Sequence, residues 1–295
     1  MPEVRPRRSV LYMPGSNPRA HEKGRSLPVD AIILDLEDAV APEAKVSARE
    51  QVVETVQKGG FGQREVAIRV NAAGTEWFER DLNTVVRARP NAVLVTKVES
   101  PEQVFAAERQ LRGRPETAGI DIWAMIETPI GVLNAAAIAG FARTEDGHRL
   151  RGFVLGTNDL INDTGIKPGH DRAPLLPWLS RVVLAARSSG LFVLDGVHNA
   201  FDDEEGFESE CRQGRAFGMD GKTIIHPNQI ATANRIFAPE PEEVAEAKSI
   251  LEAFELPENR NRGAIALNGR MVERLHARAA SRLIALDEAI RNRAQ

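Results

Sequence analysis

The chain has 295 residues, of which 42% are hydrophobic and 27% charged, and its formal net charge is −4. These values are typical of a folded soluble protein, and the negative charge and single tyrosine argue against a nucleic-acid-binding surface. No segment approaches the ~20 apolar residues of a membrane helix, and the Pro/Arg-rich start lacks the apolar core of a signal peptide. We therefore expect a cytoplasmic protein without membrane contact, in which Cys211, the only cysteine, forms no internal disulfide.

Short apolar runs recur along the chain, and each ends in a polar cluster followed by a charge-rich helical stretch such as residues 47–58, 101–111 or 175–189. Eight such runs, joined by eight crossovers, predict an α/β protein with a (β/α)8 TIM barrel over residues 1–236. A doubly wound parallel sheet is the alternative. The predicted strands are residues 9–13, 31–36, 65–70, 92–97, 122–126, 152–155, 191–194 and 222–225.

The pattern changes after the eighth run. Residues 242–254 and 270–291 have the spacing of amphipathic helices, and they flank a polar stretch, 257–263, and a short apolar patch, 264–267. We assign residues 237–295 to a C-terminal helical extension, which either packs on its own barrel or covers a neighbouring subunit.

Candidate functional residues follow the predicted strands, because the carboxyl ends of barrel strands meet at one rim. After the first strand, Ser16, Asn17 and Pro18 predict a helix start, and Arg19 and Lys23 share one face of that helix. This arrangement predicts either an anion-binding pocket or an ordinary solvated basic face.

The second strand ends in three acids, Asp35, Glu37 and Asp38. Burying them together requires a metal ion, a cationic partner or a raised pKa. Arg69, near the end of the third strand, is the candidate partner, and a salt bridge there is compatible with a role in substrate binding. After the fourth strand, Lys97 has the chemistry of a Schiff-base nucleophile, but we expect it to pair with Glu99 instead.

The fifth strand ends at Glu127, an acid without an obvious partner, which alone could be a ligand or a helix cap. Asp159 follows the neighbouring sixth strand. Two carboxylates on adjacent strand ends suit one hard cation, so we predict a site for Mg²⁺, with Mn²⁺ as the alternative. After the eighth strand, His226 either contacts substrate or is a hydrogen-bonded structural histidine.

Taken together, these segments resemble the citrate lyase β-subunit-like family of HpcH/HpaI aldolases, which includes malyl-CoA and citramalyl-CoA lyases and malyl-CoA thioesterases. The resemblance implies a (β/α)8 barrel with a C-terminal extension, assembled as a homotrimer or hexamer, with Mg²⁺ at the barrel mouth and coenzyme A as part of the substrate. The motifs that carry it are RSVLYMPGSNP, ILDLEDAVAPEAK, IRVN, TKVE, AMIET, GTNDL, LDGVHNAFDDEEGF and GKTIIHPNQ.

The resemblance also assigns roles to individual residues. Glu127 and Asp159 look like the metal ligands, and Arg69 like the group that holds substrate oxygens. The resemblance implies three further roles. Asp35, Glu37 and Asp38 would orient metal-bound waters, and Asn158, Ile225 and His226 would contact substrate. Tyr12, Arg19 and Lys23 would contact coenzyme A.

Two departures from the family pattern bear on activity. Asn17 replaces an arginine that lyases of the family often direct toward coenzyme A, which leaves phosphate binding to Arg19 and Lys23. Glu273 stands where lyases commonly have an aspartate that reaches a neighbouring active site. The longer acid resembles the thioesterase branch and favours hydrolysis over carbon–carbon cleavage.

The expected function is therefore a Mg²⁺-dependent enzyme acting on the CoA thioester of a short 3-hydroxy dicarboxylic acid such as malyl-CoA. Carbon–carbon cleavage, thioester hydrolysis or both are compatible with the sequence. The alternatives are a pyruvate-type 2-keto acid aldolase that works without coenzyme A, and an acyl-carrier-dependent citrate lyase subunit.

Overall fold

The computed structural model describes residues 4–293, which form two compact units. The larger unit comprises residues 7–234, and the smaller one comprises residues 235–293 together with residues 4–6. Among the described residues, no helix combines the length and the apolar character needed to cross a membrane.

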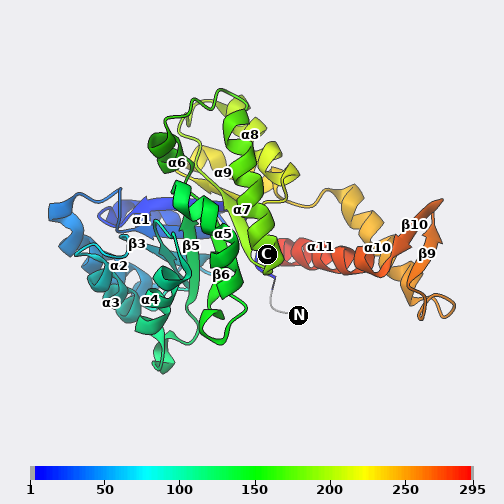
Figure 1. Cartoon of the computed structure of the whole chain (residues 1–295), viewed down its shortest axis with the longest axis horizontal. Coiled ribbons are helices and arrows are strands. Elements are labelled where there is room, and N and C mark those ends of the chain that lie inside the picture. The colour runs from blue at the N-terminus through cyan, green and yellow to red at the C-terminus, as the bar shows by residue number, and fades with distance from the viewer. Residues whose placement is uncertain (1–3, 294–295) are drawn as a thin grey trace. The chain divides into compact units, whose positions relative to one another are not determined.

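The larger unit is a closed barrel of parallel strands that pair in chain order, with β1 joined to β8 (Figure 1). The predicted (β/α)8 fold is thus confirmed, and each strand overlaps one of the predicted runs. The strands are β1 Ser9–Pro14, β2 Ala31–Asp35, β3 Glu65–Val70, β4 Ala92–Val95, β5 Asp121–Ile126, β6 Leu150–Leu155, β7 Phe192–Asp195 and β8 Gly221–Ile224.

Helices connect successive strands, and side-chain caps define several of their starts. Asn17 accepts a hydrogen bond from the Ala20 amide at the start of α1, and Ser100 and Gln103 form a capping box at α4. The helices are α1 Pro18–Gly24, α2 Lys45–Lys58, α3 Phe78–Ala88, α4 Pro101–Leu111, α5 Pro129–Phe141, α6 Thr157–Thr164, α7 Leu176–Ser188, α8 Glu204–Ala216 and α9 Ile230–Ile236. Short 3₁₀ helices are Pro42–Ala44, Pro115–Thr117, Glu145–Gly147, Ala173–Leu175 and Pro227–Gln229.

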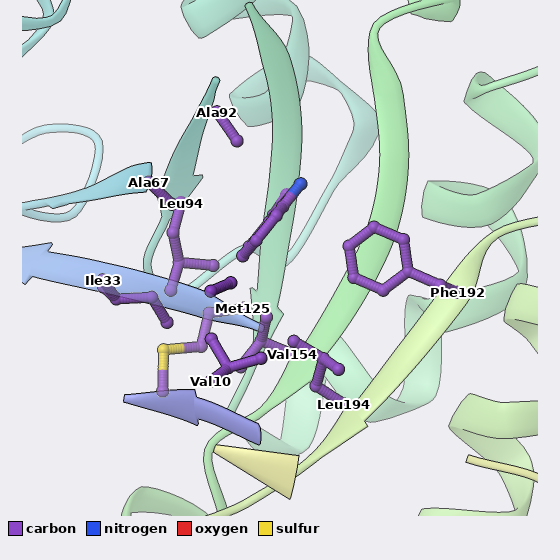
Figure 2. Close-up of a cluster of buried hydrophobic side chains, with 11 residues drawn as sticks. Val10, Ile33, Ala67, Ala92, Leu94, Met125, Val154, Phe192 and Leu194 are labelled. Carbon is purple, nitrogen blue, oxygen red and sulfur yellow. The ribbon is translucent and has the colours of Figure 1, made fainter. Parts of the chain in front are cut away.

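The barrel interior is filled by alternate side chains of the strands. Figure 2 shows Ile33, Leu94 and Met125 converging from β2, β4 and β5. Because successive strand residues face opposite sides, the alternation that buries Ile33 places Asp35 on the same inner face, one step nearer the carboxyl end. Asp35 is in register with Arg69 of β3. The alternation that fills the barrel interior therefore also places charged side chains at the carboxyl ends of the strands, which form the barrel mouth.

The smaller unit contains α10 Pro241–Glu255, the hairpin β9 Ala264–Leu267 and β10 Arg270–Glu273, and α11 Arg274–Arg293 (Figure 1). The predicted helix over residues 270–291 is wrong at its start, where residues 270–273 form the second hairpin strand. Asn268 and Gly269 connect the strands with φ values of 50° and 75°. Positive φ at both positions is the geometry of a type I′ turn, which Asn-Gly favours.

Candidate active site

Arg69 is the central cation of the barrel mouth. Its Nε and Nη2 donate to the two carboxylate oxygens of Asp35 at 2.7 and 2.6 Å, and its Nη1 lies 2.9 Å from Glu37. The guanidinium also lies over the ring of Tyr12, 4.9 Å from the centroid. The two parallel hydrogen bonds to Asp35 fix the plane of the guanidinium, because both can be kept only in one orientation. The predicted salt bridge between Arg69 and the acids of the second strand is present.

Asp35 is held from a second side by the backbone. Its Oδ1 accepts the Glu37 amide at 2.9 Å, and its Oδ2 accepts the Ala39 amide at 3.0 Å. Glu37 is also buried, and burial raises its pKa although Arg69 and Lys97 act in the opposite direction. Asp38, the third acid of the cluster, is 62% exposed and reaches Arg69 only at 3.9 Å.

Lys97 links the acids of different strands. Its Nζ donates to Glu37 at 2.7 Å and lies 3.7 Å from Asp159, while its backbone amide donates to Glu127 at 2.8 Å. The predicted pair with Glu99 is wrong: β4 ends at Val95, and Lys97 has a φ of 51°, so the strand alternation behind that prediction stops before Lys97. Burial lowers the pKa of Lys97, but the contacts with Glu37 and Glu127 outweigh it and raise the pKa overall.

Glu127 follows β5 and is fully buried. Its Oε1 accepts the Lys97 amide, whereas its Oε2 has no hydrogen-bond partner among the described residues. Burial, with a smaller contribution from Asp159 and Glu37, raises the pKa of Glu127 to about 8. A buried carboxylate oxygen without a partner is costly, which marks Glu127 as a group that awaits a ligand.

Gly156, at the start of α6, makes room for this acid. A Cβ at position 156 would lie 2.5 Å from Glu127 Oε2 and 2.3 Å from its Cβ. The position therefore accommodates Glu127 only because it lacks a side chain. Asp159 lies in the first turn of the same helix, with its side chain 30% exposed.

The side chains at the mouth are unequal in charge. Apart from the exposed Asp38, the carboxylates of Asp35, Glu37, Glu127 and Asp159 lie against the two cations Arg69 and Lys97, a formal excess of two negative charges. We call these six residues the mouth cluster. No group of three or more potential ligand side chains is arranged around one point within residues 4–293. The excess charge, the two oxygen ligands Glu127 and Asp159 and the unpartnered Oε2 fit a Mg²⁺-type ion, which takes few protein carboxylates.

The other predicted substrate contacts lie after β6 and β8 of the same barrel. Asn158 is exposed and exchanges amide hydrogen bonds with Asn199, and Ile225 is 39% exposed. His226 caps the 3₁₀ helix Pro227–Gln229 through its Nδ1, and its ring stacks on Phe201 at 5.1 Å. The structural alternative for His226 thus has direct support from these contacts.

The residues predicted to contact coenzyme A divide into two groups. Tyr12 is half-buried under Arg69, and burial raises the pKa of its hydroxyl, which keeps the group neutral. Arg19 and Lys23 are exposed on α1 and form no ion pair with other described residues.

Glu273 belongs to the smaller unit, where it ends β10, and its backbone amide donates to His276 at 2.9 Å.

A second buried ion cluster was not predicted. Lys222 lies 2.9 Å from both Asp195 and Glu210, and Arg172 contacts Asp195 at 3.0 Å. His198 adds a contact to Glu210 at 3.1 Å. We call these five residues the α8 cluster, because Glu210 belongs to α8. Asp195 and Lys222 are paired in the strand register, so neighbouring β7 and β8 would have indicated their contact.

Comparison with known proteins agrees with this geometry. A family model described as HpcH/HpaI aldolase/citrate lyase matches residues 8–227. The chain belongs to this family. The HpcH/HpaI match spans all eight strands of the barrel, including every residue of the mouth cluster.

Individual relatives of this HpcH/HpaI family member cover nearly the whole chain. The (3S)-malyl-CoA thioesterase of Cereibacter sphaeroides is 43% identical over 98% of this chain and 97% of its own length. The mitochondrial citramalyl-CoA lyase of Homo sapiens is 32% identical over 98% of this chain and 87% of its own. A crystal structure of CitE from Mycobacterium tuberculosis, in complex with magnesium, acetoacetate and coenzyme A, has a TM-score of 0.73 and 30% identity over 95% of this chain and 97% of that one.

Proposed function

We propose that this HpcH/HpaI family member is a Mg²⁺-dependent enzyme that acts on the CoA thioester of a short 3-hydroxy dicarboxylic acid. Malyl-CoA is the leading candidate, because the relative at 43% identity is a (3S)-malyl-CoA thioesterase. The observation that carries the proposal is Glu127, a fully buried acid with one unpartnered oxygen, in a cluster with two excess negative charges. Glu127 and Asp159 would hold the metal, and Mn²⁺ has the same ligand preference.

When bound, the metal supplies a Lewis acid that stabilises negative charge on an acyl oxygen of the substrate. Arg69 contributes a fixed positive charge beside it, held in place by the two oxygens of Asp35. Tyr12 closes the inner side of the site as a neutral hydroxyl whose oxygen lies 3.9 Å from the Met125 sulfur. Arg69 therefore binds the substrate carboxylate, and Tyr12 limits the depth to which the acyl group can enter.

Binding of coenzyme A is assigned to α1. Arg19 and Lys23 are exposed on a helix that follows β1, and neither forms an ion pair within residues 4–293. Two such cations on one face suit the phosphate groups of coenzyme A. Arg25, the next cation in sequence, is instead held by the Gly59 and Thr55 carbonyls, which leaves it a structural role.

The acid that decides between cleavage and hydrolysis is assigned to Glu273. In the lyase reaction a carboxylate transfers a proton to the acyl α-carbon, whereas in hydrolysis a carboxylate activates water toward the thioester carbonyl. The relative at 43% identity favours hydrolysis. We assign Glu273 to the active site of a neighbouring subunit in a cytoplasmic homotrimer or hexamer.

The test is incubation with malyl-CoA and Mg²⁺, with glyoxylate, acetyl-CoA, malate and free CoA measured separately. Malate plus CoA as main products supports hydrolysis, and glyoxylate plus acetyl-CoA supports cleavage. Glu273→Asp should shift the products toward cleavage, and Glu273→Ala should abolish both activities. The matched control is Glu252→Ala, which removes an exposed acid from α10. Wild-type turnover in Glu273→Ala would contradict the assignment.

The alternatives give different outcomes in the same assays. A pyruvate-type aldolase would release or condense free 2-keto acids without coenzyme A, and an acyl-carrier-dependent subunit would act only on acyl groups attached to a carrier protein. Absence of turnover with malyl-CoA, together with activity on either of these substrates, would replace the proposed function.

A further inference from the structure

One lysine of the mouth cluster contacts acids from three different strand ends. The ammonium of Lys97 donates to Glu37 at 2.7 Å and lies 3.7 Å from Asp159, and its amide donates to Glu127 at 2.8 Å. Its side chain is 38% exposed, whereas that of Glu37 is 7% exposed. Lys97 is therefore placed between the two proposed metal ligands and a third, buried carboxylate.

The backbone at Lys97 makes this triple contact achievable. Its φ of 51° lies in the left-handed region, which is rare for a residue with a long side chain and costs of order 1 kcal/mol. This conformation directs the amide at Glu127 while the side chain extends to Glu37 and Asp159. The strained residue thus lies where the site is assembled.

Resting on the proposed function, we propose that Lys97 is a positioning residue that sets which carboxylates the metal can use. By occupying Glu37 Oε1, its ammonium withholds this acid from the metal, so that Glu127 and Asp159 remain the two protein carboxylates available. Arg69 occupies the other oxygen, Glu37 Oε2, at 2.9 Å. Both oxygens of Glu37 are thus already engaged by cations.

A limit of two carboxylates has a consequence for metal selectivity. Mg²⁺ keeps several waters and uses one or two protein carboxylates, whereas Ca²⁺ takes six to eight oxygen ligands and gains from each additional carboxylate. Removal of the Lys97 ammonium would free one oxygen of Glu37 and raise the excess negative charge of the mouth cluster from two to three. Ca²⁺ should gain more from this change than Mg²⁺.

The test is isothermal titration calorimetry of wild-type protein and Lys97→Met with MgCl₂ and with CaCl₂, without substrate and at one fixed pH. Lys97→Met should bind Ca²⁺ about tenfold or more tightly than wild type, because a positive charge ~4 Å from a metal ligand is removed. The gain for Mg²⁺ should be smaller, so the Ca²⁺/Mg²⁺ affinity ratio rises. Lys97→Arg, which retains the charge, should keep the wild-type ratio.

Two further variants make the result decisive. Lys58→Met removes an exposed lysine of α2 that pairs with the exposed Glu22, and it should leave both affinities unchanged. Lys97→Asn is measured alongside, because asparagine tolerates left-handed φ and covers a failure of the methionine variant to fold. An unchanged ratio in the folded Lys97 variants, with wild-type protein binding Mg²⁺, would overturn this inference alone. No binding by any of the proteins would overturn the metal-dependent function and the inference together.

Discussion

The mouth cluster and the α8 cluster both bury several charges, but their balance differs. In the α8 cluster Asp195 and Glu210 face Arg172 and Lys222, two acids against two cations. Burial raises the pKa of these acids, yet the two cations outweigh it, so that both pKa values are lowered overall. In the mouth cluster the pKa of Glu127 is instead raised to about 8.

This difference separates a structural cluster from a binding site. Where each buried acid has a cation, the charges stabilise one another and nothing further is needed from solution. Where acids exceed cations, the folded protein bears a cost that an incoming cation relieves. Burial alone would have ranked the two clusters together, because Asp195 and Glu127 are both fully buried.

The largest expected effect concerns the mouth cluster, in which acids exceed cations. Glu127→Gln should lower turnover of malyl-CoA by about 10³-fold or more, because loss of a metal ligand removes several kcal/mol of transition-state stabilisation. Thermal stability without metal should stay equal or rise, since a buried carboxylate in excess is neutralised. Turnover in saturating Mg²⁺ and differential scanning calorimetry check both parts. Wild-type turnover of Glu127→Gln with a lower melting temperature would show that Glu127 stabilises the fold and does not bind the metal.

A substitution in the α8 cluster, in which acids and cations are equal in number, should instead lower stability. Asp195→Asn should reduce the free energy of unfolding by about 3–5 kcal/mol, because it leaves Lys222 buried with one partner fewer. Urea denaturation measures this change. Asp146→Asn, which removes the exposed partner of Arg112, is the control and should have a much smaller effect. Equal effects of the two variants would show that the α8 cluster contributes little.

The pH dependence of stability provides a third contrast. Glu127 has a pKa of about 8 in the folded chain against 4.5 as its ordinary value, so the folded state binds more protons between these values. Its stabilising contribution is full below pH ~4.5 and is lost as pH rises to about 8, a change of roughly 5 kcal/mol in metal-free protein. Subtracting the profile of Glu127→Gln from that of wild type isolates this slope. A flat difference would contradict it.

The acids of the α8 cluster have the opposite sign. Their lowered pKa values give stability that is present at neutral pH and is lost as pH falls through the folded pKa. The two clusters therefore destabilise the metal-free protein at opposite ends of the pH range.

The smallest effect concerns His198, which belongs to the α8 cluster through a side-chain contact of 3.1 Å to Glu210. Because Lys222 also holds Glu210, His198→Gln should cost only about 1 kcal/mol of unfolding free energy and leave turnover unchanged. Urea denaturation and malyl-CoA turnover test this. A loss of turnover without a loss of stability would instead connect His198 to the mouth.

The sequence predicted much of the barrel, because each strand is a compact apolar run with a polar end. Residues 65–70 and 101–111 were predicted with the bounds of β3 and α4. The contact between Arg69 and the acids after β2 also followed from strand order. These features depend on local pattern and on neighbouring strands.

Other features depend on backbone geometry that composition does not reveal. The partner of Lys97 was predicted wrongly because its left-handed φ breaks the alternation assumed for residues 97 and 99. The hairpin in the smaller unit was missed although Asn268-Gly269 carries a known turn signal, since the helical spacing after residue 273 was extended too far back. In the α8 cluster, Arg172 was missed because it lies in a connecting loop with no periodic pattern, whereas the contact between Asp195 and Lys222 was available from strand order.

The close approach of Gly156 to Glu127 has a consequence for classifying relatives of this chain. A methyl group at position 156 would overlap the Glu127 side chain at 2.3 Å, so a relative with alanine there could retain both acids and still misplace one of them. A survey that asks only whether the two acids are present would count such a protein as active. Reading the residue three positions before the aspartate would identify it as a paralogue with an altered or absent reaction.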